Sequence, residues 1–285
     1  MQNNILYKGK AQVTGGKFSF TFIVPKDIAY QYGFGKISYY AANEEEDAHG
    51  FYNNIMVGGL DQSVAPDTTG PEVELYMNNR YFVFGGITDE NPDMLAFVSD
   101  ASGINTVGTG IGHDIVAILD GNTDKPIILN EFYESDLDSY SSGTIIYPFN
   151  NLEEGLHTLS IKVWDVFNNS SEAYLEFNVV SSERFMINDL MNYPNPFSSS
   201  TTFVFSHNYA EGELDINLRI FNMQGQIVRT LETNLVPSGY RSELYEWDGT
   251  DDTGVPLSKG MYIYKLLVRN EEGQTDDKAG KLILK

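Results

Sequence analysis

The sequence predicts an all-β protein of tandem immunoglobulin-like β-sandwich domains. Short runs in which apolar and polar residues alternate recur along the chain, and turn residues such as Asp120-Gly121 and Glu154-Gly155 separate them. Aromatic residues make up 13% of the 285 residues, which favours strands over helices. No apolar pattern of helical period continues for ten residues or more, so we expect no long helix.

Residues 1–66 predict a partial or small β-sandwich. Phe18, Phe20 and Phe22 alternate with other residues, as in a strand packed mainly on one face. Strands are expected within residues 4–24 (two strands), 36–42 and 51–57. Four strands in so short a stretch make a thin core. Met1 is not followed by the basic and apolar segments of a signal peptide, so we expect the natural protein to extend upstream.

Two further sandwiches are expected, at residues 67–185 and 186–285. A linker rich in Gly, Pro and Thr precedes the first of them, and Trp164 is its candidate core aromatic. Its strands are expected at 73–77, 95–99, 114–119, 143–148, 158–165 and 173–179. Residues 181–191 are expected to connect it to the last sandwich. The strands there are expected at 201–206, 215–222, 227–235, 242–247, 260–268 and 278–285.

Composition excludes several classes of function. The chain has 18 basic and 40 acidic residues, a net charge of −22, which disfavours binding to nucleic acid. It contains no Cys, so disulfides, thiolate metal sites and thiol nucleophiles are excluded. No apolar run reaches the length of a membrane helix. The acidity suits an exposed extracellular surface, or loops that bind calcium.

The motifs that suggest catalysis are incomplete. The Gly-rich run at residues 108–112 does not fit the dinucleotide fingerprint, and no helix follows it. His113-Asp114 resembles part of a hydrolytic triad, but no nucleophile elbow is present. The histidines are too few and too scattered to predict a zinc site. We therefore expect no catalytic residue in this chain.

Calcium is the ligand hypothesis that the residues support best. Asp120, Asn122 and Asp124 place oxygen atoms at alternate positions, as calcium loops do. Lys125-Pro126 stands where the bend glycine is expected, so an Asp-Gly turn is the competing interpretation. Further acidic groups occur at residues 131–138 and 248–252. Hence we expect no cofactor other than this weak calcium candidate.

The tail resembles the C-terminal domain of proteins handled by the type IX secretion system of the Bacteroidetes. The blocks that carry this resemblance are residues 193–197, 221–231, 247–254, 259–266 and 281–285. The rest of the chain is similar to the region after the peptidase domain in the PorU family, through residues 20–28, 35–41, 103–114, 119–121 and 163–171. PorU proteins are the C-terminal signal peptidases (sortases) of that system, of the gingipain-type cysteine peptidase family. Asp67-Thr68-Thr69 also resembles the short O-glycosylation signal of Bacteroidetes surface proteins.

The resemblance implies a non-catalytic role in scaffolding, export and docking at the outer membrane. In the family an upstream His–Cys dyad cleaves the C-terminal signals of secreted cargo, and no catalytic residue can be transferred to a chain without Cys. It also implies a cell-surface location after export through the periplasm, with a PorV-like outer-membrane barrel as partner and cargo bound through the full-length protein. The candidate docking or export residues are Pro194, Asn195, Pro196, Phe197, Gly260, Tyr262, Tyr264, Lys281 and Leu282.

Two alternative readings stay open. One is a surface adhesin or carbohydrate-binding module, which clustered exposed aromatic rings would support because sugar faces stack on them. Trp164 and Trp247 stand in apolar strand contexts and are expected to be buried instead. The other is the tail of an ordinary type IX cargo protein, which predicts cleavage near Asn192 on secretion.

Overall fold

The structure is a computed structural model with an almost entirely β architecture, as the sequence predicted. It describes residues 5–26, 28, 31–43, 45–59, 65–107, 112–181, 184–209, 212–237, 239–244 and 246–285. Within them the helical content is a single 3-10 turn, η1 (Asn130–Phe132). No helix in these described parts has the length and apolar character needed to cross a membrane. The chain forms two compact units, residues 1–75, 95–147 and 159–174, and residues 76–94, 148–158 and 175–285.

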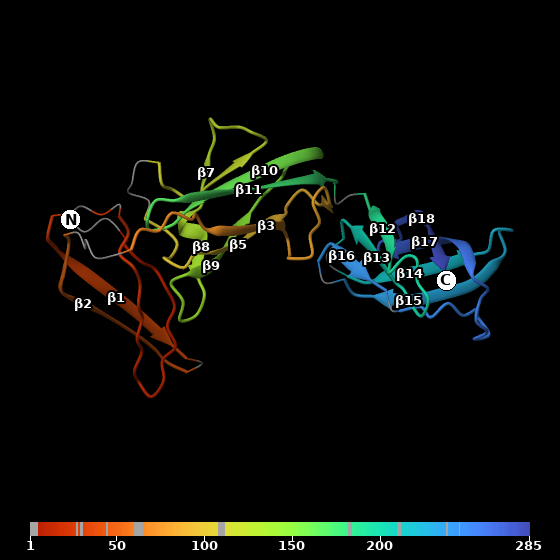
Figure 1. Cartoon of the computed structure of the whole chain (residues 1–285), viewed down its shortest axis with the longest axis horizontal. Helices are drawn as coiled ribbons and strands as arrows, with labels where there is room; N and C mark the ends of the chain where they lie inside the picture. Colours follow the sequence, from red (N-terminus) through yellow and green to blue (C-terminus); the bar gives the residue numbers. More distant parts are fainter. Residues whose placement is uncertain are drawn as a thin grey trace. The chain divides into compact units, whose positions relative to one another are not determined.

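A two-stranded antiparallel sheet stands near the start of the chain (Figure 1). It consists of β1 (Gly33–Ala42) and β2 (Asp47–Val57), at the positions predicted for the third and fourth strands. The prediction of two strands within residues 4–24 is wrong. The backbone described there forms only isolated bridges, Lys10 with Leu137 and Thr14 with Lys17.

The alternating phenylalanines that suggested a strand pack against other aromatic rings instead. The rings of Tyr7 and Phe22 stack with centroids 4.7 Å apart, and Phe20 lies 6.3 Å from Phe22. Phe18 meets the edge of Tyr39 on β1, at 5.8 Å. The placement of an aromatic residue at every second position therefore brings the rings together, although the described backbone there does not pair as a continuous strand.

The strands of the middle region form two sheets. One has the order β3-β5-β9-β8 and the other β4-β11-β10-β6-β7. The first contains β3 (Glu72–Met77), β5 (Asp93–Ser99), β9 (Ser142–Pro148) and β8 (Tyr133–Ser135). The second contains β4 (Ile87–Thr88), β11 (Ser170–Val179), β10 (Gly155–Trp164), β6 (Val116–Leu119) and β7 (Ile127–Ile128). Leu159, Ile161 and Val163 alternate inward along β10 and are buried, which is why this segment forms a strand.

The last part of the chain forms a sandwich of two antiparallel sheets, drawn in cyan to blue in Figure 1. The three-stranded sheet has the order β12-β13-β16, from β12 (Ile187–Tyr193), β13 (Thr202–His207) and β16 (Arg241–Glu243). The four-stranded sheet has the order β15-β14-β17-β18, from β14 (Leu214–Phe221), β15 (Ile227–Leu235), β17 (Gly260–Asn270) and β18 (Thr275–Leu284). Their inner faces share one core that includes Phe203, Phe205, Leu218, Trp247 and Leu266.

Three details differ from the sequence predictions. Residues 187–193 form strand β12 and are not a connection, and a bulge between Asn188 and Met191 breaks the alternation that would have revealed the strand. Strand β16 ends at Glu243, and Trp247 returns only as an isolated bridge to Thr201. Trp164 is half-buried and is not the centre of the core. The domain boundaries at 66/67 and 185/186 stay predictions.

Candidate functional site

Two segments predicted to matter for docking lie side by side. The lead-in segment, residues 194–197, contacts residues 281–285, which are the end of β18 and the following Lys285. We call this pair of segments the terminal clip. The Phe197 amide donates to the Ile283 carbonyl (3.0 Å), and the Lys285 amide donates to the Phe197 carbonyl (2.8 Å). Asn195 Nδ2 donates to the Lys281 carbonyl (2.9 Å), and the Ile283 amide donates to Asn195 Oδ1 (3.0 Å). Residues almost ninety positions apart are thus joined by four hydrogen bonds.

Several candidate docking residues fill the core of the sandwich. Phe197 is 2% exposed, Tyr264 is 2% exposed and Leu282 is fully buried. The ring of Phe197 lies 5.6 Å from that of Trp247. Burial raises the pKa of Tyr264 to about 12. These side chains contribute to packing, and a partner cannot reach them in the folded state.

Five of the other candidates lie on the surface, and the sixth is buried. Pro194, Asn195, Pro196, Gly260 and Lys281 are exposed. Tyr262 is buried, and its hydroxyl donates to the Ser258 carbonyl at 2.6 Å. The docking role of the whole set stays a prediction.

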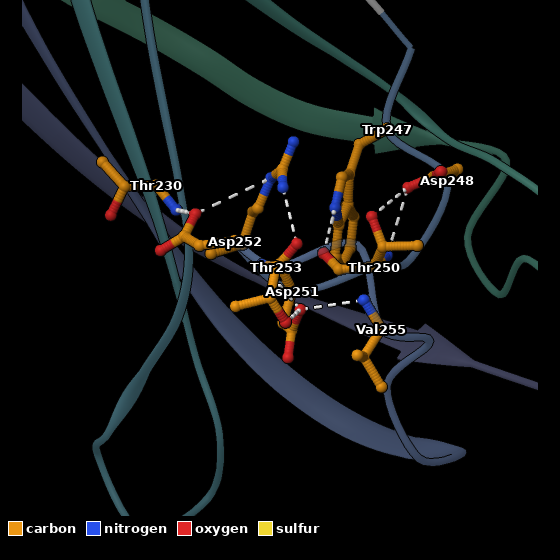
Figure 2. A network of polar contacts seen from close by, with 9 residues as sticks. Thr230, Trp247, Asp248, Thr250, Asp251, Asp252, Thr253 and Val255 are labelled. Atoms are coloured by element: carbon orange, nitrogen blue, oxygen red, sulfur yellow. Dashed lines mark hydrogen bonds and ion pairs between the residues drawn. The ribbon is translucent and has the colours of Figure 1, made fainter.

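The acidic group at residues 248–252 lies in a loop whose own amides and hydroxyls donate hydrogen bonds to its carboxylates (Figure 2). Asp248 Oδ1 accepts the amide and hydroxyl hydrogens of Thr250, at 3.1 and 2.7 Å. Asp251 Oδ1 accepts both from Thr253, at 2.8 and 2.7 Å, and also the Val255 amide at 2.9 Å. The hydroxyl of Thr250 lowers the pKa of Asp248, and that of Thr253 lowers the pKa of Asp251. These two carboxylates shape a turn.

Asp252 of the same loop bonds to the edge of the four-stranded sheet. Its Oδ1 accepts the amide hydrogen of Thr230 (2.9 Å), and it lies 3.9 Å from Arg229 Nε (Figure 2). Arg229 also donates to the Asp251 carbonyl at 2.6 Å. Strand β15 stands at the end of the sheet order, so no strand of the described residues pairs with its outward amides. Asp252 therefore covers an edge amide, which limits unwanted strand pairing.

The predicted calcium residues lie in an exposed turn. Asp120 and Gly121 both have positive φ, 53° and 65°. The Asn122 amide donates to the Leu119 carbonyl (3.0 Å), and Asn122 Oδ1 accepts the Asp124 amide (3.2 Å). One of the three predicted ligand oxygens is thus engaged in the turn itself. Calcium binding by Asp120, Asn122 and Asp124 stays a prediction.

A different group of carboxylates converges elsewhere. Asp67, Asp100 and Asp165 each bring one oxygen within 4.8 Å of the others. Asp165 is fully buried, and its Oδ1 accepts the amides of Phe167 and Asn169, at 2.8 and 2.7 Å. Within the described residues this is the one group of three or more acidic, His or Cys side chains close enough to share a cation.

The pKa values of two of these carboxylates shift in opposite directions. The hydroxyl of Ser102 donates to Asp67 and, with Thr69, lowers the pKa of Asp67 to about 2. Burial raises the pKa of Asp100, and the charges of Asp165 and Asp67 add to this effect. Oxygen atoms of this kind are those that hard cations prefer. Hydrogen bonds within the cluster also hold the carboxylates in place.

Sequence reasoning missed this cluster, although a signal was present. Asp67 and Asp100 each precede a hydroxyl residue by two positions and a glycine by three, so the same short turn occurs twice. Thr68, in the suggested glycosylation signal, is exposed, whereas the hydroxyl of Thr69 donates to Asp67 (2.9 Å).

The motifs that suggested catalysis form no site among the described residues. Residues 108–111 of the Gly-rich run lie outside the described parts. The His113 ring packs against Trp164, with centroids 4.4 Å apart. His157 stacks on Phe177 at 5.5 Å, and His207 bonds to Ser242 at 2.8 Å. These three histidines lie in separate surroundings and do not form a common site.

The chain is similar in sequence to a solved PorU protein along nearly its whole length. A crystal structure of dimeric latent PorU from Porphyromonas gingivalis is 33% identical over 94% of this chain, with a TM-score of 0.41. The match covers 25% of that PorU chain, so this chain spans about a quarter of its length. Residues 194–272 match the FlgD Ig-like domain family. No curated protein matches the sequence.

Other similar structures are distant. A β-glycosidase from Bacteroides vulgatus is 9% identical, with a TM-score of 0.35, over 76% of this chain and 25% of that one. Fibronectin(III)-like modules of Clostridium thermocellum CbhA are 8% identical, with a TM-score of 0.27, over 75% of this chain and 94% of theirs. Likenesses at this level carry no argument about function.

Proposed function

We propose that this chain is the non-catalytic C-terminal region of a type IX secretion sortase, and that it scaffolds, exports and docks the enzyme at the outer membrane. The observation that carries the proposal is the 33% identity with PorU over 94% of the chain. Because the identity covers nearly the whole chain, it supports a common region and not merely a shared sandwich fold.

The chemistry of the chain agrees with this proposal. A sequence without Cys cannot supply the thiol nucleophile of a cysteine peptidase. The parent protein would therefore carry its catalytic dyad in another domain. That domain would cleave the C-terminal signals of secreted cargo, while the present region would hold the enzyme at the cell surface through a PorV-like barrel.

The proposal is tested by removing the last sandwich, residues 186–285, from the full-length protein. Deleting only the final strand would open the core, because Leu282 and Leu284 are buried there. We expect the shortened protein to be lost from the outer-membrane fraction, as measured by immunoblotting of cell fractions. A full-length protein with Ile146→Thr, an exposed position on β9, is the control. Normal retention of the shortened protein would refute the docking role.

One observation favours the alternative of a carbohydrate-binding module. Tyr40, Phe51 and Tyr52 on the β1–β2 sheet are 69%, 62% and 48% exposed. Exposed rings on one small sheet offer flat apolar surfaces of the kind that stack against sugars. Trp247 is buried and Trp164 half-buried, so neither adds an exposed indole to this set. Saturable binding on a glycan array that disappears in Tyr40→Ala/Phe51→Ala would favour this alternative.

A further inference from the structure

The last sandwich, residues 186–285, is less acidic than the rest of the chain, with nine of the 18 basic residues and 14 of the 40 acidic residues. Residues 216–231, 256–270 and 278–285 contain no Asp or Glu. They contain eight of the 18 basic residues: Arg219, Arg229, Lys259, Lys265, Arg269, Lys278, Lys281 and Lys285. The remainder of the chain therefore carries 10 basic and all 40 acidic residues. These three segments therefore place a local excess of cations within a sandwich whose own net charge is negative.

The strand register places some of these cations around exposed apolar side chains. Ile263 on β17 pairs with Phe221 on β14 and with Lys281 on β18. Met261 pairs with Ile283 on β18. Ile263 is 43% exposed, Met261 44% and Ile283 37%. These residues alternate with the buried Tyr262, Tyr264 and Leu282, so they belong to the outward side of the sheet.

Two cations beside these apolar residues form no ion pair with any acidic residue that the structure describes. Arg219 lies two positions from Phe221 on β14, and Lys281 lies two positions from Ile283 on β18. Both are exposed, and neither forms an ion pair within the described residues. Lys265, by contrast, already pairs with Asp277 at 2.9 Å. Arg219 and Lys281 therefore remain available to an external anion.

We propose that this surface, the outer tail face, is the docking surface, and that it binds an acidic protein surface with an apolar centre. The outer tail face consists of Arg219, Phe221, Met261, Ile263, Lys281 and Ile283. The inference rests on the proposed function. Of the docking residues predicted from the sequence, the outer tail face includes only Lys281. Apolar side chains flanked by two cations complement an apolar patch that lies beside acidic groups.

The charge distribution favours a protein over a lipid surface. An anionic membrane presents a continuous negative field, which would repel the strongly acidic remainder of the chain. An acidic patch on a protein covers a limited area, so the outer tail face can contact it while the acidic remainder of the chain stays away from the negative charge. Charged rims of this kind set the association rate and the salt dependence, while the apolar centre slows dissociation.

The test measures binding of the purified chain to outer-membrane vesicles from a strain of its own bacterium that lacks the parent gene. Arg219→Glu/Lys281→Glu is compared with Lys125→Glu/Arg184→Glu, which changes the net charge equally at two exposed cations elsewhere. We expect the first variant to bind about tenfold or more weakly and the second to bind as the wild type does. Wild-type binding should also weaken as salt rises.

The apolar centre is tested separately. Ile263→Thr keeps a β-branched residue on β17 and removes apolar surface, and Ile146→Thr is its matched control. We expect Ile263→Thr to raise the dissociation rate with little change in salt dependence. Circular dichroism establishes that each variant is folded before binding is measured.

Further measurements distinguish a failure of the proposed function from a failure of the present inference. If the chain lacking residues 186–285 still binds the vesicles, the proposed function fails. If that deletion abolishes binding but Arg219→Glu/Lys281→Glu does not weaken it, only the present inference fails. Protease-treated vesicles should lose binding, and liposomes of the extracted lipids should not bind. Equal binding to these liposomes would assign the face to lipid and overturn the inference.

Discussion

His207 is a fully buried histidine in the core of the last sandwich. Its Nε2 lies 2.8 Å from the Ser242 hydroxyl, and its ring lies 5.5 Å from Phe205. Burial lowers the pKa of His207 to about 4, because the low-dielectric core disfavours the imidazolium. A neutral histidine is therefore part of the folded state at physiological pH.

This burial predicts acid sensitivity with a defined sign. In the unfolded chain His207 takes up a proton near pH 6.5, but the folded state resists protonation until about pH 4. Stability attributable to His207 is complete above about pH 6.5 and decreases as pH falls towards 4, by about 3 kcal/mol in all. Urea unfolding from pH 4 to 8 should show a flatter profile for His207→Gln, and an unchanged slope would contradict the assignment.

At the scale of elements, the loop at residues 248–255 explains how an edge strand is kept from pairing. Asp252 accepts the Thr230 amide at the edge of β15. We expect Asp252→Ala to lower the free energy of unfolding by about 1 kcal/mol, since the side chain is partly exposed. It should also increase self-association, as measured by light scattering.

The control for this prediction is Asp215→Ala. Asp215 is exposed on β14, and its side chain makes no hydrogen bond or ion pair within the described residues. It carries the same charge and should leave both stability and association unchanged. Equal effects of the two substitutions would attribute the result to charge and not to the edge amide.

Strand β12 gives a second prediction at this scale, because an ordinary cargo tail would be cut near Asn192. Asn192 is 7% exposed, pairs with Phe203 across the sheet, and donates to Thr201 Oγ1 at 3.0 Å. Cleavage there requires the strand to leave the sheet. Limited proteolysis of the folded chain, read by mass spectrometry, should therefore give no cut within residues 187–193. A cut at Asn192 would support the cargo reading.

The alternation of apolar and polar residues identified most strands, but it did not show which strands pair with one another. The prediction for residues 158–165 falls largely on β10, because Leu159, Ile161 and Val163 alternate with polar residues there. Residues 18–22 alternate equally well yet form no strand, since alternation cannot show whether a neighbouring strand exists. The repeated turn at Asp67 and Asp100 was a signal in the sequence, but their approach to Asp165 could not be predicted, because the three residues come together only through the fold.

At the scale of the whole molecule, the last sandwich has a core of its own. Every buried member, from Phe185 to Leu284, comes from one continuous stretch of sequence. We therefore expect residues 184–285, expressed alone, to fold cooperatively, with a single thermal transition and the near-ultraviolet dichroism of a buried Trp247. A broad transition without near-ultraviolet signal would show that the sandwich depends on the rest of the chain.

The terminal clip has a consequence for the order of events during synthesis. Phe197, near the beginning of the sandwich, pairs with Leu284 in its last strand, β18. Synthesis from the N-terminus makes the two partners of this bridge at opposite ends of the sandwich, so the clip cannot form until β18 has been made. Until then the ring of Phe197 lacks the strand that covers it and is open to cellular proteases. Closure of this sandwich is thus a late event, set by the synthesis of its last strand.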